Sequence, residues 1–96
     1  MKVMAIASPT AALTPDTLQP HMAREVRATL QHYLDGVIEQ YWFREKRGPI
    51  FLMNVESVEH AQKELDTLPL VAAKLMTYEL MPVGPLAPLG LLIQGK

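Results

Sequence analysis

Apolar and polar positions divide the chain into four short apolar runs and two segments with helical spacing. The run Lys2–Ala7 is bounded by Ser8-Pro9 and predicts a buried first strand rather than a signal peptide, because its apolar stretch is too short for one. The segment Ser8–Pro20 contains three prolines and predicts a loop. Within this loop, Thr14-Pro15-Asp16 is suited to begin a short helical turn, with proline at its first position.

A long helix is predicted from about Pro20 to Asp35, and Gly36 is suited to end it. Its apolar residues recur near the i, i+4, i+8 spacing of one stripe: Met22, Val26, Leu30, Tyr33, Leu34 and Val37. Arg24, Arg27, Gln31 and Asp35 fall on the other side. We therefore expect the apolar stripe to pack on the body of the protein, with the polar positions in solvent.

The second half of the chain predicts two strands joined by a turn, then a helix and a last strand. Ile38–Glu45 is rich in β-branched and aromatic residues, and Lys46-Arg47-Gly48 connects it to a strand at Ile50–Asn54. A helix follows Ser57, a good N-cap, and Pro69 stops it. The last strand is expected at Lys74–Met81.

The predicted order is β-α-β-β-α-β, which is the order of an α+β, ferredoxin-like domain: an antiparallel sheet with both helices on one face. A chain of 96 residues makes one domain, 1–96. Its leucine- and proline-rich end, at about 83–96, is expected to lie as an apolar arm against the body or against a neighbouring subunit.

Composition indicates a homo-oligomer and excludes several classes of partner. Hydrophobic residues make up 49% of this small chain, six of them methionine, and large apolar patches are rare on monomers. Both faces of the strand Ile38–Glu45 carry aromatics, so a second subunit is expected to cover the free sheet face, as in a dimeric α+β barrel. The net charge of −1 gives no footprint for nucleic acid. No apolar run approaches the roughly 20 residues of a membrane span, and the absence of cysteine favours a reducing, cytoplasmic compartment.

The segment Pro49–Leu86 resembles the C-terminal half of the muconolactone isomerase-like family. The resemblance rests on Val55-Glu56-Ser57, on Leu68-Pro69-Leu70 after the helix, and on the strand exit from Pro82 to Leu86. It implies a dimeric α+β barrel that assembles further, works without a cofactor, and carries charged residues on its first helix near the substrate. The family often has a Trp-Arg pair on the second strand, whereas here Phe43 separates Trp42 from Arg44.

Three titratable residues of the first helix share one stripe, at i, i+4 and i+11: His21, Glu25 and His32. Two readings stay open. The stripe lies well away from the side of Met22 and Val26, which favours a plain solvated face. Alternatively, Glu25 is the base that moves a proton between two carbons, and His21 tunes or relays that proton. No third ligand lies at a tight spacing, so no metal site is predicted.

The second strand and the last strand supply the other candidates. Arg44, beside aromatics at a strand end, is suited to bind a carboxylate through paired hydrogen bonds, or is a surface charge. Four aromatic residues line a substrate pocket or belong to the core: Tyr33, Tyr41, Trp42 and Tyr78.

Together these features lead to competing hypotheses of function. One is a small isomerase-like enzyme without cofactor that acts by proton transfer on a small carboxylated lactone or aromatic-derived acid, with Glu25, His21 and Arg44 as catalytic residues. The second is a non-enzymatic oligomerising or ligand-binding protein of the same fold. The third is a cofactor-free monooxygenase-like enzyme. An open cavity between the first helix and the sheet would favour an enzyme, and a closed core the binding module.

Overall fold

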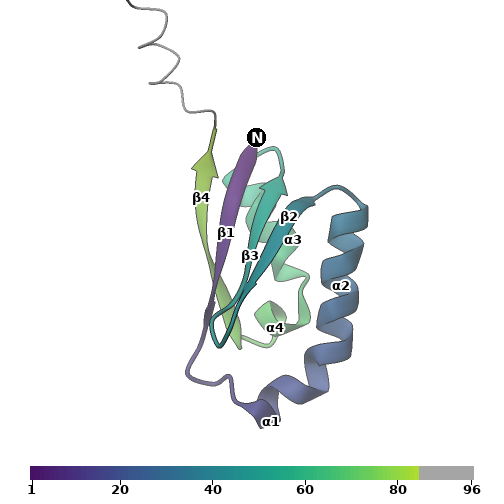
Figure 1. The fold of residues 1–96 in the computed structure, drawn as a ribbon, viewed down its shortest axis with the longest axis vertical. Coiled ribbons are helices and arrows are strands. Elements are labelled where there is room, and N and C mark those ends of the chain that lie inside the picture. The colour runs from purple at the N-terminus through teal and green to yellow at the C-terminus, as the bar shows by residue number, and fades with distance from the viewer. Residues whose placement is uncertain (85–96) are drawn as a thin grey trace, which may run out of the picture.

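The computed structural model describes residues 1–84. The elements follow the predicted order, including the short helical turn after Thr14, with two short additions, η1 and α4 (Figure 1). They are β1 (Lys2–Pro9), α1 (Pro15–Leu18), the 3-10 turn η1 (Gln19–His21), α2 (Met22–Leu34), β2 (Ile38–Arg44), β3 (Gly48–Asn54), α3 (Val58–Asp66), α4 (Pro69–Ala72) and β4 (Met76–Val83).

The four strands form one antiparallel sheet in the order β2-β3-β1-β4. The helices α2, α3 and α4 all lie on one side of this sheet (Figure 1). This arrangement confirms the predicted α+β, ferredoxin-like fold. Strand β4 runs two residues further than predicted, through Pro82 and Val83. The rest of the predicted C-terminal arm lies outside the described residues.

The core lies between the sheet and α3. Strand residues that point to the helix side are buried together with the apolar seam of α3, and the set comprises Val3, Ala5, Phe51, Met53, Ala61, Leu65 and Leu68. Each large aliphatic or aromatic side chain buried in this way contributes about 1.5–3 kcal/mol of transfer free energy. The core therefore fixes β1, β3 and α3 firmly, and the other elements attach to this unit.

Local signals in the sequence explain where the helices begin and end. The side chains of Thr14 and Ser57 cap α1 and α3, accepting hydrogen bonds from Thr17 N–H and His60 N–H. Gly36 has a φ of +82°, which is the left-handed conformation expected just after a helix. Pro69 ends α3 as predicted, but it also opens α4, a further helical turn that the sequence analysis missed.

The prediction for the two faces of α2 was wrong. The stripe predicted to be buried is half exposed: Met22 is 41%, Val26 49% and Leu30 46% accessible. The buried residue of the helix is instead Glu25, at 9%. Polar contacts hold α2 to α3 and α4 on this inner side, because Glu25 bonds to the backbone of α4 and His32 bonds to Thr67. The apolar stripe is thereby turned along the sheet edge instead of into the core.

The second face of the sheet is apolar and has no helix over it within residues 1–84 (Figure 1). The strand registers place one set of side chains on this face: Met4, Ile6, Trp42, Ile50, Leu52 and Met81. Four of these side chains are half-buried, namely Met4, Ile6, Ile50 and Leu52, and the other two, Trp42 and Met81, are exposed. This is the surface that the sequence analysis predicted a second subunit would cover.

We predict that Gly48→Ala destabilises the protein more than Gly36→Ala. Both glycines have positive φ, +88° and +82°, which costs an alanine roughly 1–2 kcal/mol. At Gly48 an added Cβ would also lie 3.1 Å from Met76 Cε and 3.2 Å from Ala7 Cβ, whereas nothing lies within 4 Å at Gly36. Urea denaturation should therefore show an additional loss of about 1 kcal/mol or more for Gly48→Ala. Equal losses for the two variants would contradict this packing argument.

Candidate functional site

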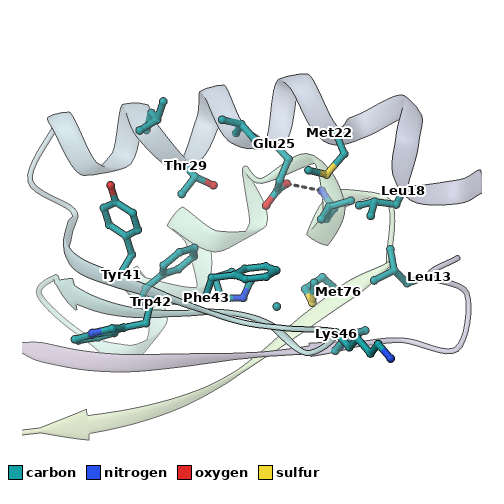
Figure 2. Close-up of a pocket in the computed structure, with 17 residues that line it drawn as sticks. Leu13, Leu18, Met22, Glu25, Thr29, Tyr41, Trp42, Phe43, Lys46 and Met76 are labelled. Carbon is teal, nitrogen blue, oxygen red and sulfur yellow. Dashed lines mark hydrogen bonds between the residues drawn. The ribbon is translucent and has the colours of Figure 1, made fainter. Parts of the chain in front are cut away.

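A cavity of about 490 Å³ lies between α2 and the β2–β3 end of the sheet. Figure 2 shows the side chains of the helix and of the sheet pointing toward each other across it. Seventeen residues line it: Pro9, Leu13, Leu18, Met22, Glu25, Val26, Thr29, Leu30, Tyr41, Trp42, Phe43, Lys46, Gly48, Pro49, Phe51, Leu70 and Met76. Most are apolar, and the volume is within the range of small-molecule sites. The half-exposed stripe of α2 is thus one wall of this cavity.

Glu25 is the buried charged group of the cavity wall. Its Oε1 accepts a hydrogen bond of 3.0 Å from the backbone N–H of Leu70, in the first turn of α4, and Figure 2 shows the carboxyl group projecting from α2 toward the sheet. Burial raises the pKa of the Glu25 carboxyl above its ordinary value of 4.5, while the Leu70 N–H and the nearby His21 act in the opposite direction. A carboxyl group in an apolar wall with a raised pKa has the properties of a general base.

Tyr78 lies behind this wall, in the core. Its ring stacks on Phe51 with centroids 5.6 Å apart, and its hydroxyl is buried without a hydrogen-bond partner among residues 1–84. Burial raises the pKa of the Tyr78 phenol, and the charge of Glu25 raises it further, so the phenol stays protonated at neutral pH. Tyr78 was predicted to line a substrate pocket. It does not border the cavity itself, and Phe51 stands between the two.

The aromatic residues of β2 divide between the two faces of the sheet. Tyr41 and Phe43 pair with Phe51 and Pro49 of β3 and point to the helix side, whereas Trp42 alternates to the other face and only borders the cavity. Tyr33 of α2 meets Tyr41 edge to face, with centroids 5.2 Å apart. Tyr41 therefore lines the cavity from the helix side, Trp42 borders it, and Tyr33 packs against Tyr41 without lining it.

The two histidines of the stripe, His21 at the end of η1 and His32 in α2, have separate surroundings. His21 lies close enough to Glu25 to influence its pKa, and its Nδ1 is 3.1 Å from Arg24 Nη2. His32 is 2.9 Å from Thr67 Oγ1 and 3.4 Å from Glu64 Oε2. Of the three residues in the stripe, Glu25 and His32 thus face α4 and α3, where polar groups pair with them, whereas the half-exposed His21 contacts Arg24 of the following turn. The reading of the stripe as a plain solvated face therefore does not hold for Glu25 and His32.

Arg44 lies outside the large cavity. Its guanidinium donates hydrogen bonds to three backbone oxygens, those of Ala7, Arg47 and Gly48. It borders a second, smaller cavity of about 350 Å³ together with Arg47 and Glu79. Arg44 and Glu25, predicted to act on one substrate, are therefore not brought together around one space.

Several lining residues were missed in the sequence. Leu13 and Leu18 come from the loop and turn before α2, and Met76 opens β4, so each reaches the cavity only through the folded topology. Lys46 was assigned to the hairpin turn alone. Thr29 carried a usable signal, since it follows Glu25 by one helical turn at the border of the apolar stripe.

Residues 1–84 contain no group of three or more histidine, aspartate or glutamate side chains placed to hold a metal ion. No helix among them combines the length and the apolar character that a membrane crossing requires.

Comparison with known proteins identifies the fold but not a family by sequence. No family model matches the chain, and no curated protein matches it. Among solved structures, muconolactone isomerase matches with a TM-score of 0.70 and 19% identity, over 90% of this chain and 93% of that one. The fold is that of muconolactone isomerase, in agreement with the resemblance that the C-terminal half predicted. At this identity the similarity establishes the fold alone.

We predict that Glu25→Gln stabilises the protein at neutral pH and that the gain disappears in acid. The raised pKa means that folding favours the protonated carboxyl: its stabilisation is full below pH 4.5 and is lost as the pH rises through the folded-state pKa. Glutamine stays uncharged and its oxygen can still accept the Leu70 N–H. Thermal melts of the wild type and Glu25→Gln between pH 4 and 8 measure the stability difference, with the exposed Glu45→Gln as control. A difference that is constant with pH would contradict a raised pKa.

Proposed function

We propose that the protein is a cofactor-independent enzyme of the isomerase-like type, which moves a proton between two carbons of a small carbonyl compound. The observation that supports this most directly is the buried Glu25 carboxyl in the wall of an apolar cavity of about 490 Å³. The fold shared with muconolactone isomerase is a weaker support, because one fold hosts many reactions.

The proposed reaction begins with Glu25 as carboxylate. It removes a proton from the carbon next to the substrate carbonyl, and the electron pair of the broken C–H bond moves onto the carbonyl oxygen as an enolate. Hydroxyl groups in the same cavity, those of Thr29 and Tyr41, are available to donate to that oxygen. The protonated Glu25 then returns the proton to a different carbon of the conjugated system. No oxidant, metal or second substrate is consumed.

The raised pKa of Glu25 suits this cycle. A carboxylate with an ordinary pKa is a weak base, and its basicity increases as burial raises the pKa toward the working pH. The bond from Leu70 N–H leaves one carboxyl oxygen, Oε2, for the substrate. In the proposed site Glu25 is the base, His21 adjusts its charge, and Tyr41 and Trp42 form part of the wall. Arg44 has no part, because its guanidinium is bound to backbone oxygens outside the cavity.

A ligand-binding protein without catalysis is the second candidate. It is favoured by the hydrogen bond between Glu25 and Leu70, which gives the carboxyl a purely structural role in joining α2 to α4. The two candidates differ in what Glu25→Gln does: the amide keeps the structural bond but cannot accept a proton.

We predict that the protein catalyses proton exchange in unsaturated five-membered lactones, and that Glu25→Gln lowers the rate at least about 100-fold, the usual contribution of a general base. α-Angelica lactone and muconolactone serve as substrates in D₂O, with deuterium entry and double-bond migration followed by NMR. Since the base must be ionised, kcat/KM should rise with pH through a pKa above 4.5 and then level off.

Glu45→Gln, in the exposed hairpin turn, is the matched control and should keep the wild-type rate. Exchange of neither lactone, or wild-type exchange by Glu25→Gln, would remove the enzyme proposal and leave the ligand-binding one.

We further propose that the protein forms a homodimer through the free sheet face. The apolar side chains of Met4, Ile6, Ile50 and Leu52 stand next to one another on the paired strands β1 and β3, and no element of residues 1–84 covers them. A continuous apolar surface of this kind is typical of a subunit interface. A second copy, with its sheet facing the first, would cover it.

Leu52→Arg should therefore convert the dimer to a monomer in sedimentation velocity at micromolar concentration, because it places a charge in the centre of the apolar face. Gln31→Arg, on the exposed side of α2, is the control and should leave the dimer intact. A wild-type protein that sediments as a monomer would contradict the proposal.

A further inference from the structure

The charged residues that line the cavity beside Glu25 are not those expected of a site that binds a carboxylate. Of its seventeen lining residues, Glu25 and Lys46 are the charged ones, and Glu25 is negative and buried while Lys46 is exposed. Figure 2 shows Lys46 at the turn between β2 and β3, with its side-chain nitrogen directed away from Glu25. Among residues 1–84, no cationic side chain is therefore aimed into the space where a ligand carboxylate would lie beside Glu25.

Arg44, which was expected to bind a ligand carboxylate, already donates its hydrogen bonds to backbone oxygens of the protein. Arg44 Nε donates to Gly48 O at 3.3 Å, and its Nη2 donates to the carbonyl oxygens of Ala7 and Arg47. These bonds hold the guanidinium at the end of the β2–β3 hairpin, at the smaller cavity. Turning it toward the large cavity would break all three hydrogen bonds, including the one to Ala7 that joins the hairpin end to β1.

A carboxylate in the large cavity would also interfere with Glu25. Two negative charges in an apolar space disfavour each other, and an unpaired charge is costly to bury. The ligand would bind weakly, and it would raise the pKa of Glu25 further, so that the base would be held in its protonated form. An uncharged ligand has neither effect and leaves Glu25 free to ionise.

We propose that this cavity takes uncharged, flat apolar carbonyl compounds, of about the size of a two-ring aromatic ketone or lactone, and rejects carboxylates of the same shape. The aromatic and aliphatic walls supply the contact area, through Phe43, Phe51 and Val26 among others. The hydroxyl groups of Thr29 and Tyr41 match a carbonyl oxygen. The carbonyl part rests on the proposed function, whereas the preference for uncharged ligands rests on the cavity alone.

The test compares two ligands of nearly equal shape, 2-acetonaphthone and 2-naphthoate, by calorimetric titration of the full chain. At pH 7 the ketone should bind at least about tenfold more tightly than the carboxylate, which corresponds to about 1.4 kcal/mol. The difference should shrink as the pH falls toward 4, where the acid becomes neutral. Equal or tighter binding of the carboxylate at pH 7, or no binding of either ligand at 1 mM, would overturn the proposal.

Three variants at the cavity and one control on the exposed side of α2 locate the effect. Glu25→Gln should tighten carboxylate binding and leave ketone binding unchanged, and Lys46→Met should leave both unchanged. Val26→Trp fills the cavity from a half-exposed position and should abolish ketone binding, while Arg27→Trp, on the exposed side of the same helix, should not. A loss of carboxylate binding in Lys46→Met, or ketone binding that survives Val26→Trp, would contradict the assignment.

The outcomes also separate this inference from the proposed function. Selective ketone binding without proton exchange in any lactone would remove the enzyme proposal and keep the ligand class. Proton exchange with tighter binding of muconolactone than of α-angelica lactone would keep the enzyme and overturn the ligand class.

Discussion

The hydrogen bond between the Glu25 carboxyl and the Leu70 backbone N–H determines the shape of the candidate site. It joins the first turn of α2 to the first turn of α4, through two residues that are 45 positions apart in the chain. Because Glu25 faces inward, the apolar stripe of α2 cannot also face inward. The stripe is turned to the sheet edge, where it stands opposite Tyr41 and Phe43, and the space between these side chains is the cavity. A polar contact in the core thus creates an apolar space outside it.

This arrangement also explains why α2 has a different character from α3. The buried face of α3 is apolar, with Ala61 and Leu65 in the main core. The inner face of α2 is largely polar: Glu25 and His32 bond to groups on or after α3, and the small Ala28 between them packs on the core. Apolar burial is therefore strong at one helix and weak at the other. The site lies at the helix that is held less by its core and more by specific hydrogen bonds, where replacement of a few residues can reshape the cavity without loss of the sheet.

Much of the fold, but less of the site, could be predicted from the sequence. The strands and the helix ends are predictable because each depends on a few neighbouring residues, such as the caps at Thr14 and Ser57 and the glycine at position 36. The orientation of α2 depends on partners far along the chain, above all Leu70. Helical periodicity correctly found the apolar stripe, but a stripe can line a cavity as well as a core. Arg44 illustrates the same difficulty, because its three backbone partners come together only in the folded hairpin.

The chemistry of Glu25 is hard to account for as structure alone. A glutamine at this position would accept the Leu70 N–H equally well and would not be penalised by ionisation in an apolar wall, so a residue selected only to join α2 to α4 need not be acidic. Among residues 1–84, the charged residues that line the cavity are Glu25 and Lys46, and the exposed Lys46 does little to offset the charge of a Glu25 carboxylate. Proteins commonly retain such destabilising groups where function requires them. An ionisable carboxyl next to an open apolar cavity, at a structural position that an amide could fill, is therefore evidence for proton chemistry that the fold by itself does not supply.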